Sequence, residues 1–149
     1  MVMLLVQFGF GMEINLFVGI TRHHPGAGGT NFFSGVFDSV SWSIVHGPIA
    51  LAIHAAFGLA IFVGATHNFV QNLRWGTRGT VWASGLGWLL IVAAGLNGGA
   101  FLHSNKDVNS LLMALFFGAA VLCYAISIYL LMRRSAAQGA GKAGEAGAA

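Results

Sequence analysis

Long apolar runs limit this chain to very few folds. Four runs, at about residues 2–20, 48–67, 80–102 and 110–132, consist mainly of hydrophobic and small residues. A helix of about 20 apolar residues crosses the ~30 Å hydrocarbon core of a bilayer. Charged residues make up 7% of the sequence, against roughly 25% in a soluble domain. The sequence therefore predicts an all-α fold, an integral membrane bundle of four transmembrane helices.

Proline, glycine and polar residues set the boundaries of the predicted helices. Pro25 and the glycines beside it end the first apolar run, because neither residue type continues a helix readily. Pro48 opens the second run, since proline is tolerated in the first turn of a helix. Residues 36–47 mix polar and aromatic side chains, which favours an interfacial or re-entrant segment. We expect one transmembrane domain over residues 1–134 and a disordered Ala/Gly-rich cytoplasmic tail at 135–149.

Basic residues are distributed unequally between the two sides of the predicted bundle. Membrane proteins carry more lysine and arginine in their cytoplasmic loops. We therefore expect a multi-pass protein of the cell membrane with both termini in the cytoplasm. The basic residues assigned to the cytoplasmic side are Arg74, Arg78, Arg133, Arg134 and Lys142, and those on the outer side are Arg22 and Lys106.

Small residues recur every four positions in the later helices, for example at Gly95 and Gly99 or at Ala114 and Gly118. This spacing lets helix backbones approach closely in lipid. The expected partners are the lipid bilayer and either other membrane protein subunits or further copies of the chain. The net charge of +3 is too small for a nucleic-acid footprint, so nucleic acid is not an expected partner.

Three polar residues interrupt the apolar runs at membrane depth: Glu13, His54 and Asn97. An ionisable group inside a bilayer costs a few kcal/mol unless it is paired or hydrated. We therefore expect Glu13 and His54 to face the bundle interior and to form an intramembrane pair. The pair either joins the first helix to the second or takes part in ligand binding, proton exchange or substrate binding.

Histidines near the outer ends of the predicted helices are candidate ligands. His46 and His103 flank two of these ends at similar depth and are the candidates for binding one haem b. His23, His24, His46 and His103 are the candidates for a divalent metal, with Glu13 or Asp38 nearby. His54 and His67 lie about 140° apart around one helix, so they do not form a same-face pair for stacked haems. No hydrolase or phosphate-binding motif occurs, and we expect no enzymatic activity of the chain on its own.

Two parts of the sequence resemble small prokaryotic four-span membrane proteins of uncharacterised activity. They are LLVQFGFGMEINLFVGI with the following HHPGAGG, and HGPIALAIHAAFGLAIFVGA. The resemblance covers about the first two predicted helices, implies a four-span bundle and transfers no functional residues. In size and histidine content the chain also looks like cytochrome-b-type anchor subunits, but it lacks their matched pairs of intramembrane histidines.

These features leave three functions open. The first is an accessory or structural subunit of a larger membrane assembly, favoured by the small residues and the few charges. The second is a membrane redox subunit that binds haem b or a metal ion near the outer face through its histidines. The third is a small proton-linked carrier that uses Glu13 and His54.

Overall fold

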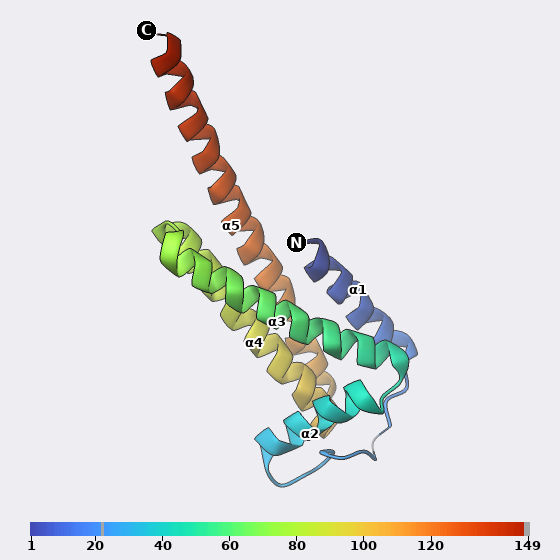
Figure 1. The fold of residues 1–149 in the computed structure, drawn as a ribbon. Helices are drawn as coiled ribbons and strands as arrows, with labels where there is room; N and C mark the ends of the chain where they lie inside the picture. Colours follow the sequence, from blue (N-terminus) through green and yellow to red (C-terminus); the bar gives the residue numbers. More distant parts are fainter. Residues whose placement is uncertain (22, 148–149) are drawn as a thin grey trace.

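The fold is a bundle of α-helices (Figure 1). A computed structural model describes residues 1–21 and 23–147, with side chains up to residue 138. These residues form five helices and no strand, which confirms the predicted all-α class. In chain order they are α1 Val2–Phe17, α2 Phe32–Val45, α3 Ile49–Trp75, α4 Arg78–Ser104 and α5 Asp107–Gly147.

Three of the five helices are long and apolar enough to cross a membrane, namely α3, α4 and α5. The predicted first span at 2–20 is shorter in the structure, because α1 ends at Phe17 and Val18 has an extended backbone. Its 16 residues measure about 24 Å at 1.5 Å per residue, less than the ~30 Å hydrocarbon thickness. The helices α4 and α5 extend beyond the predicted spans at both ends, and α3 extends beyond its predicted span at the C-terminal end. The α2 helix is too short to cross.

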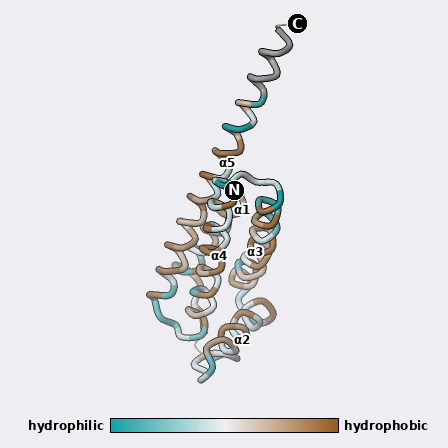
Figure 2. The backbone as a smooth tube through the Cα atoms, turned by 90° about the vertical axis from the view of Figure 1, so that its left-hand side faces the viewer, coloured by the Kyte–Doolittle hydropathy of each residue, from teal (hydrophilic) through white to brown (hydrophobic). Residues whose placement is uncertain are grey.

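The helices run between two distinct ends of the bundle. Figure 1 places the N-terminus and the α3–α4 turn at one end, and α2 with the residues that precede it at the other, which we call the cap end. Hydrophobic residues cover most of α3, α4 and the lower part of α5 (Figure 2). The structure describes α5 as continuing to Gly147, into the segment from residue 135 for which the composition predicts a disordered tail.

Close packing of α4 against α5 forms the centre of the bundle. Ala120 is completely buried, and Ile91 is 6% exposed. A Cβ atom at Gly87 would lie 3.0 Å from the ring of Tyr124 and 3.3 Å from Cβ of Cys123. Larger residues would therefore push the two helices apart, which agrees with the use of small residues for packing in lipid.

The segment predicted as interfacial is a helix that lies across the cap end (Figure 1). Asn31 caps α2 by accepting a hydrogen bond from the Ser34 amide, which satisfies one of the free donors in the first turn. Val36, Ser39 and Ser43 are buried. A Cβ at Gly99 would lie 2.5 Å from Val36, so a glycine in α4 is what lets α2 approach.

A glycine turn before α2 holds the cap end together. Gly26 has a φ of +90°, a conformation that L side chains rarely adopt. A Cβ on Gly26 would lie 2.7 Å from both the amide nitrogen and the hydroxyl oxygen of Ser39. Both the backbone conformation and the space therefore require glycine.

Replacing Gly26 with alanine should destabilise the protein by about 1–3 kcal/mol, because the new methyl group combines backbone strain with a clash. Gly64→Ala is the matched control, since Gly64 lies inside α3 and its Cβ would meet nothing within 4 Å. The control should be neutral or more stable by up to about 1 kcal/mol. Chemical unfolding in detergent, followed by circular dichroism, measures both; equal stability of the two variants would contradict the tight turn.

Candidate functional site

A polar contact joins α1 to α3 inside the bundle. The side-chain amide of Gln7 donates to the backbone carbonyl of His54 at 3.1 Å and lies 3.3 Å from the Nε2 atom of the His54 ring. Gln7 is 6% exposed. Because the amide nitrogen only donates, the ring Nε2 accepts, and the imidazole proton therefore lies on Nδ1.

Two glycines make room for this contact. A Cβ on Gly11 would lie 3.1 Å from Cε1 of the His54 ring, and a Cβ on Gly58 would lie 3.2 Å from Nε2 of Gln7. The two glycines lie on different helices, one on α1 and one on α3. The backbones can therefore approach closely enough for a short amide side chain to reach the imidazole.

The contact also has unused hydrogen-bonding capacity. Oε1 of Gln7 and Nδ1 of His54 are both buried and have no hydrogen-bond partner among the described residues. Buried polar atoms are normally paired. The pair thus presents one acceptor and one donor beyond those used to join the helices.

The predicted pair of Glu13 and His54 does not form in the described part of the chain. Glu13 is exposed, and the α1 partner of His54 is Gln7. Glu13 lies about 120° around the helix from Gln7 at 3.6 residues per turn, so both cannot face α3. The signal for Gln7 was the spacing of Leu4, Gln7 and Ile14, which form the buried face of α1.

Asn97, the third predicted intramembrane residue, is satisfied within its own helix. Its side-chain amide donates to the carbonyl of Ala93 at 2.8 Å. This bond links residues one turn apart on α4. Asn97 therefore does not join the contact between Gln7 and His54.

His103 fastens the glycine turn to the end of α4. Its ring Nδ1 donates to the carbonyl of Gly26, and its own carbonyl accepts from the amide of Gly28 at 2.9 Å. The ring meets the face of Phe32 edge-on, with centroids 6.0 Å apart. A Cβ on Gly35 would overlap the ring. His103 thus holds the loop, α2 and α4 together.

His24 occupies the other side of the same turn. Its Nδ1 donates to the carbonyl of Pro25 at 2.9 Å, and its ring stacks on Trp42 with centroids 4.4 Å apart. Its Nε2 is buried and has no hydrogen-bond partner among the described residues. In both His24 and His103 the bonded Nδ1 leaves the lone pair on Nε2, the tautomer that metal-binding histidines commonly use.

The four histidines predicted as metal ligands do not converge in the structure. Residues 1–21 and 23–147 contain no group of three or more His, Cys, Asp or Glu side chains that could hold a metal ion. His23 and His46 are exposed. The other two rings lie at different points along α2, since His24 stacks on Trp42 and His103 packs over Gly35.

The predicted haem ligands His46 and His103 are also separated. His103 contacts the first turn of α2 at Phe32, whereas His46 follows the last residue of that helix. The 14 residues of α2 span about 21 Å at 1.5 Å per residue. A bis-histidine haem needs both imidazoles on one iron, so the arrangement does not bring this pair together.

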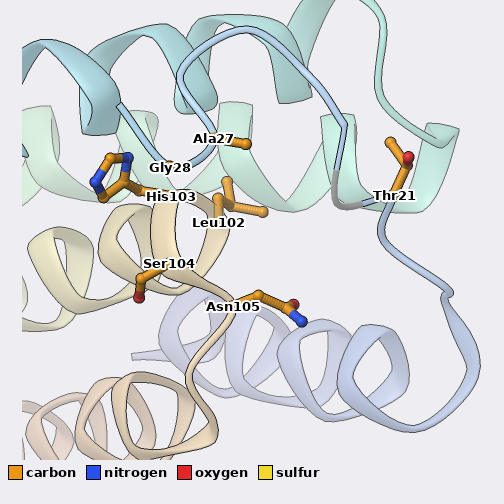
Figure 3. Close-up of a pocket in the computed structure, with 7 residues that line it drawn as sticks. All are labelled: Thr21, Ala27, Gly28, Leu102, His103, Ser104 and Asn105. Carbon is orange, nitrogen blue, oxygen red and sulfur yellow. The ribbon is translucent and has the colours of Figure 1, made fainter. Parts of the chain in front are cut away.

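Two hollows lie beside the histidines at the cap end. The first has a volume of about 280 Å³, and in it the His103 ring points away from Thr21 and Asn105 (Figure 3). The second, of about 260 Å³, lies beside Trp42. The first is lined by Thr21, Ala27, Gly28, Leu102, His103, Ser104 and Asn105, and the second by Pro25, Asp38, Ser41, Trp42, Val45 and His46.

The contact between Gln7 and His54 predicts coupled stabilities. Gln7→Leu removes both hydrogen bonds and His54→Leu removes the one to the imidazole ring, so the free energy of unfolding of the double variant should differ from additivity by about 0.5–1.5 kcal/mol. Unfolding of the four proteins of this cycle in detergent measures the coupling.

The matched cycle pairs Glu13→Leu with His54→Leu. It should be additive within about 0.3 kcal/mol, because the two side chains do not touch. Coupling between Glu13 and His54, together with additivity between Gln7 and His54, would show that Glu13 is the residue of α1 that meets His54, as the sequence predicted.

Comparison of the chain with models of protein families, with curated proteins and with solved structures gives no match. The site must therefore be interpreted from the residues of this chain. It consists of a polar contact between α1 and α3 and a histidine-bound cap formed by the loop, α2 and the end of α4.

Proposed function

We propose that the chain is a four-span membrane protein that serves as an accessory or structural subunit of a larger membrane assembly. The observation that carries this proposal is the position of Glu13. Its carboxylate is exposed on an apolar helix between Met12 and Ile14. None of the described residues forms an ion pair or hydrogen bond with it.

The outward position of Glu13 is unfavourable in a bilayer. It lies four residues before the end of α1, about 6 Å along the helix axis. Its neighbours Met12 and Leu16 are 44% and 65% exposed. A carboxylate among lipid-facing side chains is stabilised when a neighbouring protein supplies a donor or a positive charge. A second subunit packed on this face of α1 would do so.

The four-span proposal requires α1 to cross the membrane, and the length of α1 does not decide whether it does. The N-terminus lies at the same end as the α3–α4 turn, and α1 ends near the start of α3 (Figure 1). A helix shorter than the hydrocarbon core can be accommodated by local thinning of the bilayer or by association with other helices. Association is the role that the Glu13 face supports.

The polar contacts favour this function over the two alternatives. A carrier would need Glu13 and His54 to work as a pair, yet His54 bonds to Gln7. A redox subunit would need histidines at one centre, yet the His24 ring stacks on Trp42 in the second half of α2, whereas the His103 ring contacts Phe32 at its start. Each of these contacts joins helices or holds a loop, which is what a structural subunit requires.

The proposed topology predicts a labelling pattern in intact cells. In a Cys123→Ala background, Thr30→Cys and Lys106→Cys should react with an impermeant maleimide from outside. Gly76→Cys and Val2→Cys should react only after permeabilisation, because basic residues favour the cytoplasmic side. External labelling of Val2→Cys would mean that α1 does not cross, and external labelling of Gly76→Cys would reverse the orientation.

The proposed assembly predicts that Glu13 controls association. After extraction from the native membrane in mild detergent, the protein should run as a complex. This complex should be larger than one 15.6 kDa chain together with its bound detergent. Glu13→Gln should shift it towards the monomer, because the charge that a neighbour neutralises is lost. Asp107→Asn is the matched control, since Asp107 is an exposed acid in the first turn of α5, and it should leave the complex intact. A wild-type protein that is monomeric both in the membrane, by cross-linking, and in detergent would refute the proposal.

A further inference from the structure

Four arginines gather at the end of the bundle opposite the cap. Arg74 lies in the last turn of α3, Arg78 is the first residue of α4, and Arg133 and Arg134 lie in α5. We call this surface the arginine end. A Cβ on Gly79 would lie 3.1 Å from Cδ1 of Leu130, so the start of α4 touches α5 one turn before Arg133 and Arg134.

Among the residues whose side chains the structure describes, no acidic residue pairs with the arginine end. All four arginines are exposed. No salt bridge joins any of them to another described residue. The acidic residues whose side chains are described, Glu13, Asp38 and Asp107, lie in the last turns of α1, in α2 and at the start of α5, which are at or near the cap end (Figure 1).

Exposed aromatic residues accompany the arginines. Trp75, Trp82 and Tyr129 are 79%, 78% and 63% exposed. Trp82 follows Arg78 by four residues, and Tyr129 precedes Arg133 by four, so each aromatic lies on the same helix face as its arginine. Tryptophan and tyrosine prefer the headgroup level of a bilayer because each combines an apolar ring with one polar atom.

Apolar side chains continue the surface into the spans. Leu73 is 56% exposed in α3, and Met132 is 68% exposed in α5. A ligand that satisfies both parts of this surface has a phosphate for the guanidinium groups and hydrocarbon for the neighbouring side chains. Arginine binds phosphate oxygens with two parallel hydrogen bonds.

We propose that the arginine end binds the phosphate headgroups of anionic phospholipids. The acyl chains of the bound lipid lie along α3, α4 and α5, and the exposed tryptophans lie beside the headgroup. Because each basic residue near an anionic membrane surface strengthens binding by about fivefold at low salt, the arginines together select phosphatidylglycerol over phosphatidylcholine. This lipid site does not depend on the proposed assembly.

Binding of single lipids to the full chain tests the proposal. Native mass spectrometry in a neutral detergent, with phosphatidylglycerol or phosphatidylcholine of the same acyl chains added, measures the fraction of protein with bound lipid. The wild-type protein should bind phosphatidylglycerol at least about tenfold more tightly than phosphatidylcholine. Equal binding of the two lipids would overturn the proposal.

Matched variants locate the site. Arg133→Gln with Arg134→Gln should weaken phosphatidylglycerol binding by tenfold or more, because two phosphate contacts are lost. Arg133→Lys with Arg134→Lys should retain most of it and shows that the region still folds. Lys106→Gln, an exposed basic residue at the cap end, should change binding less than twofold. Equal losses in the Lys106 and arginine variants would place the lipid elsewhere.

A test with inorganic phosphate distinguishes a site for a phospholipid headgroup from a site for free phosphate, because both ligands offer phosphate oxygens to arginine. Phosphate at millimolar concentration should neither displace phosphatidylglycerol from the protein nor raise its midpoint of thermal unfolding, because it offers nothing to the apolar side chains. Displacement at that concentration, or an equal rise in the unfolding midpoint with phosphate and with phosphatidylglycerol, would identify a site for free phosphate and overturn the assignment to lipid.

Discussion

Polar groups on apolar helices must find their partners within the protein or its neighbours, because the hydrocarbon core of a bilayer offers no water. The contact between Gln7 and His54 meets this requirement for α1 and α3. It fixes the rotation of α1 about its own axis. With Gln7 turned inward, Glu13 is turned outward, so this rotation sets the face of α1 on which we propose that a second subunit packs.

The two ends of the bundle carry different chemistry. At the cap end, imidazole rings bind backbone carbonyls, and glycines at 26, 35 and 99 leave the space that these close contacts need. At the arginine end the charged groups are exposed and face outward. The first arrangement stabilises a loop and a short helix, whereas the second is available to groups outside the chain.

Length and hydropathy were sufficient to predict the long helices. The predictions at 80–102 and 110–132 lie within α4 and α5, and the prediction at 48–67 starts one residue before α3, since long apolar runs have few alternatives. The predicted first span ends early at Phe17. The α2 helix was missed because its buried face uses small residues, Gly35, Ser39 and Ser43, which carry little hydropathy. Their spacing by four and the Asn31 cap were the available signals.

The site was harder to predict than the fold. Glu13 was the predicted partner of His54 because it is ionisable, yet the side chain that meets His54 is the neutral Gln7. The partners of His24 and His103 are the backbone carbonyls of Pro25 and Gly26, and a sequence pattern does not identify a carbonyl as a partner. Histidines were counted as ligands because spacing alone does not reveal which ring nitrogen is already bonded.

In the proposed bundle α1 lies in the bilayer against α3, with Gln7 on His54. Solid-state NMR of the protein in lipid bilayers, with labelled glutamine, glutamate and histidine, measures which side chain lies beside the His54 ring. A Gln71→Leu variant removes the second close glutamine–histidine contact, between Gln71 and His67. We expect a through-space correlation between the Gln7 side-chain nitrogen and the His54 ring, with the ring proton on Nδ1. A His54 ring that correlates with the Glu13 carboxylate, or with lipid acyl chains only, would contradict it.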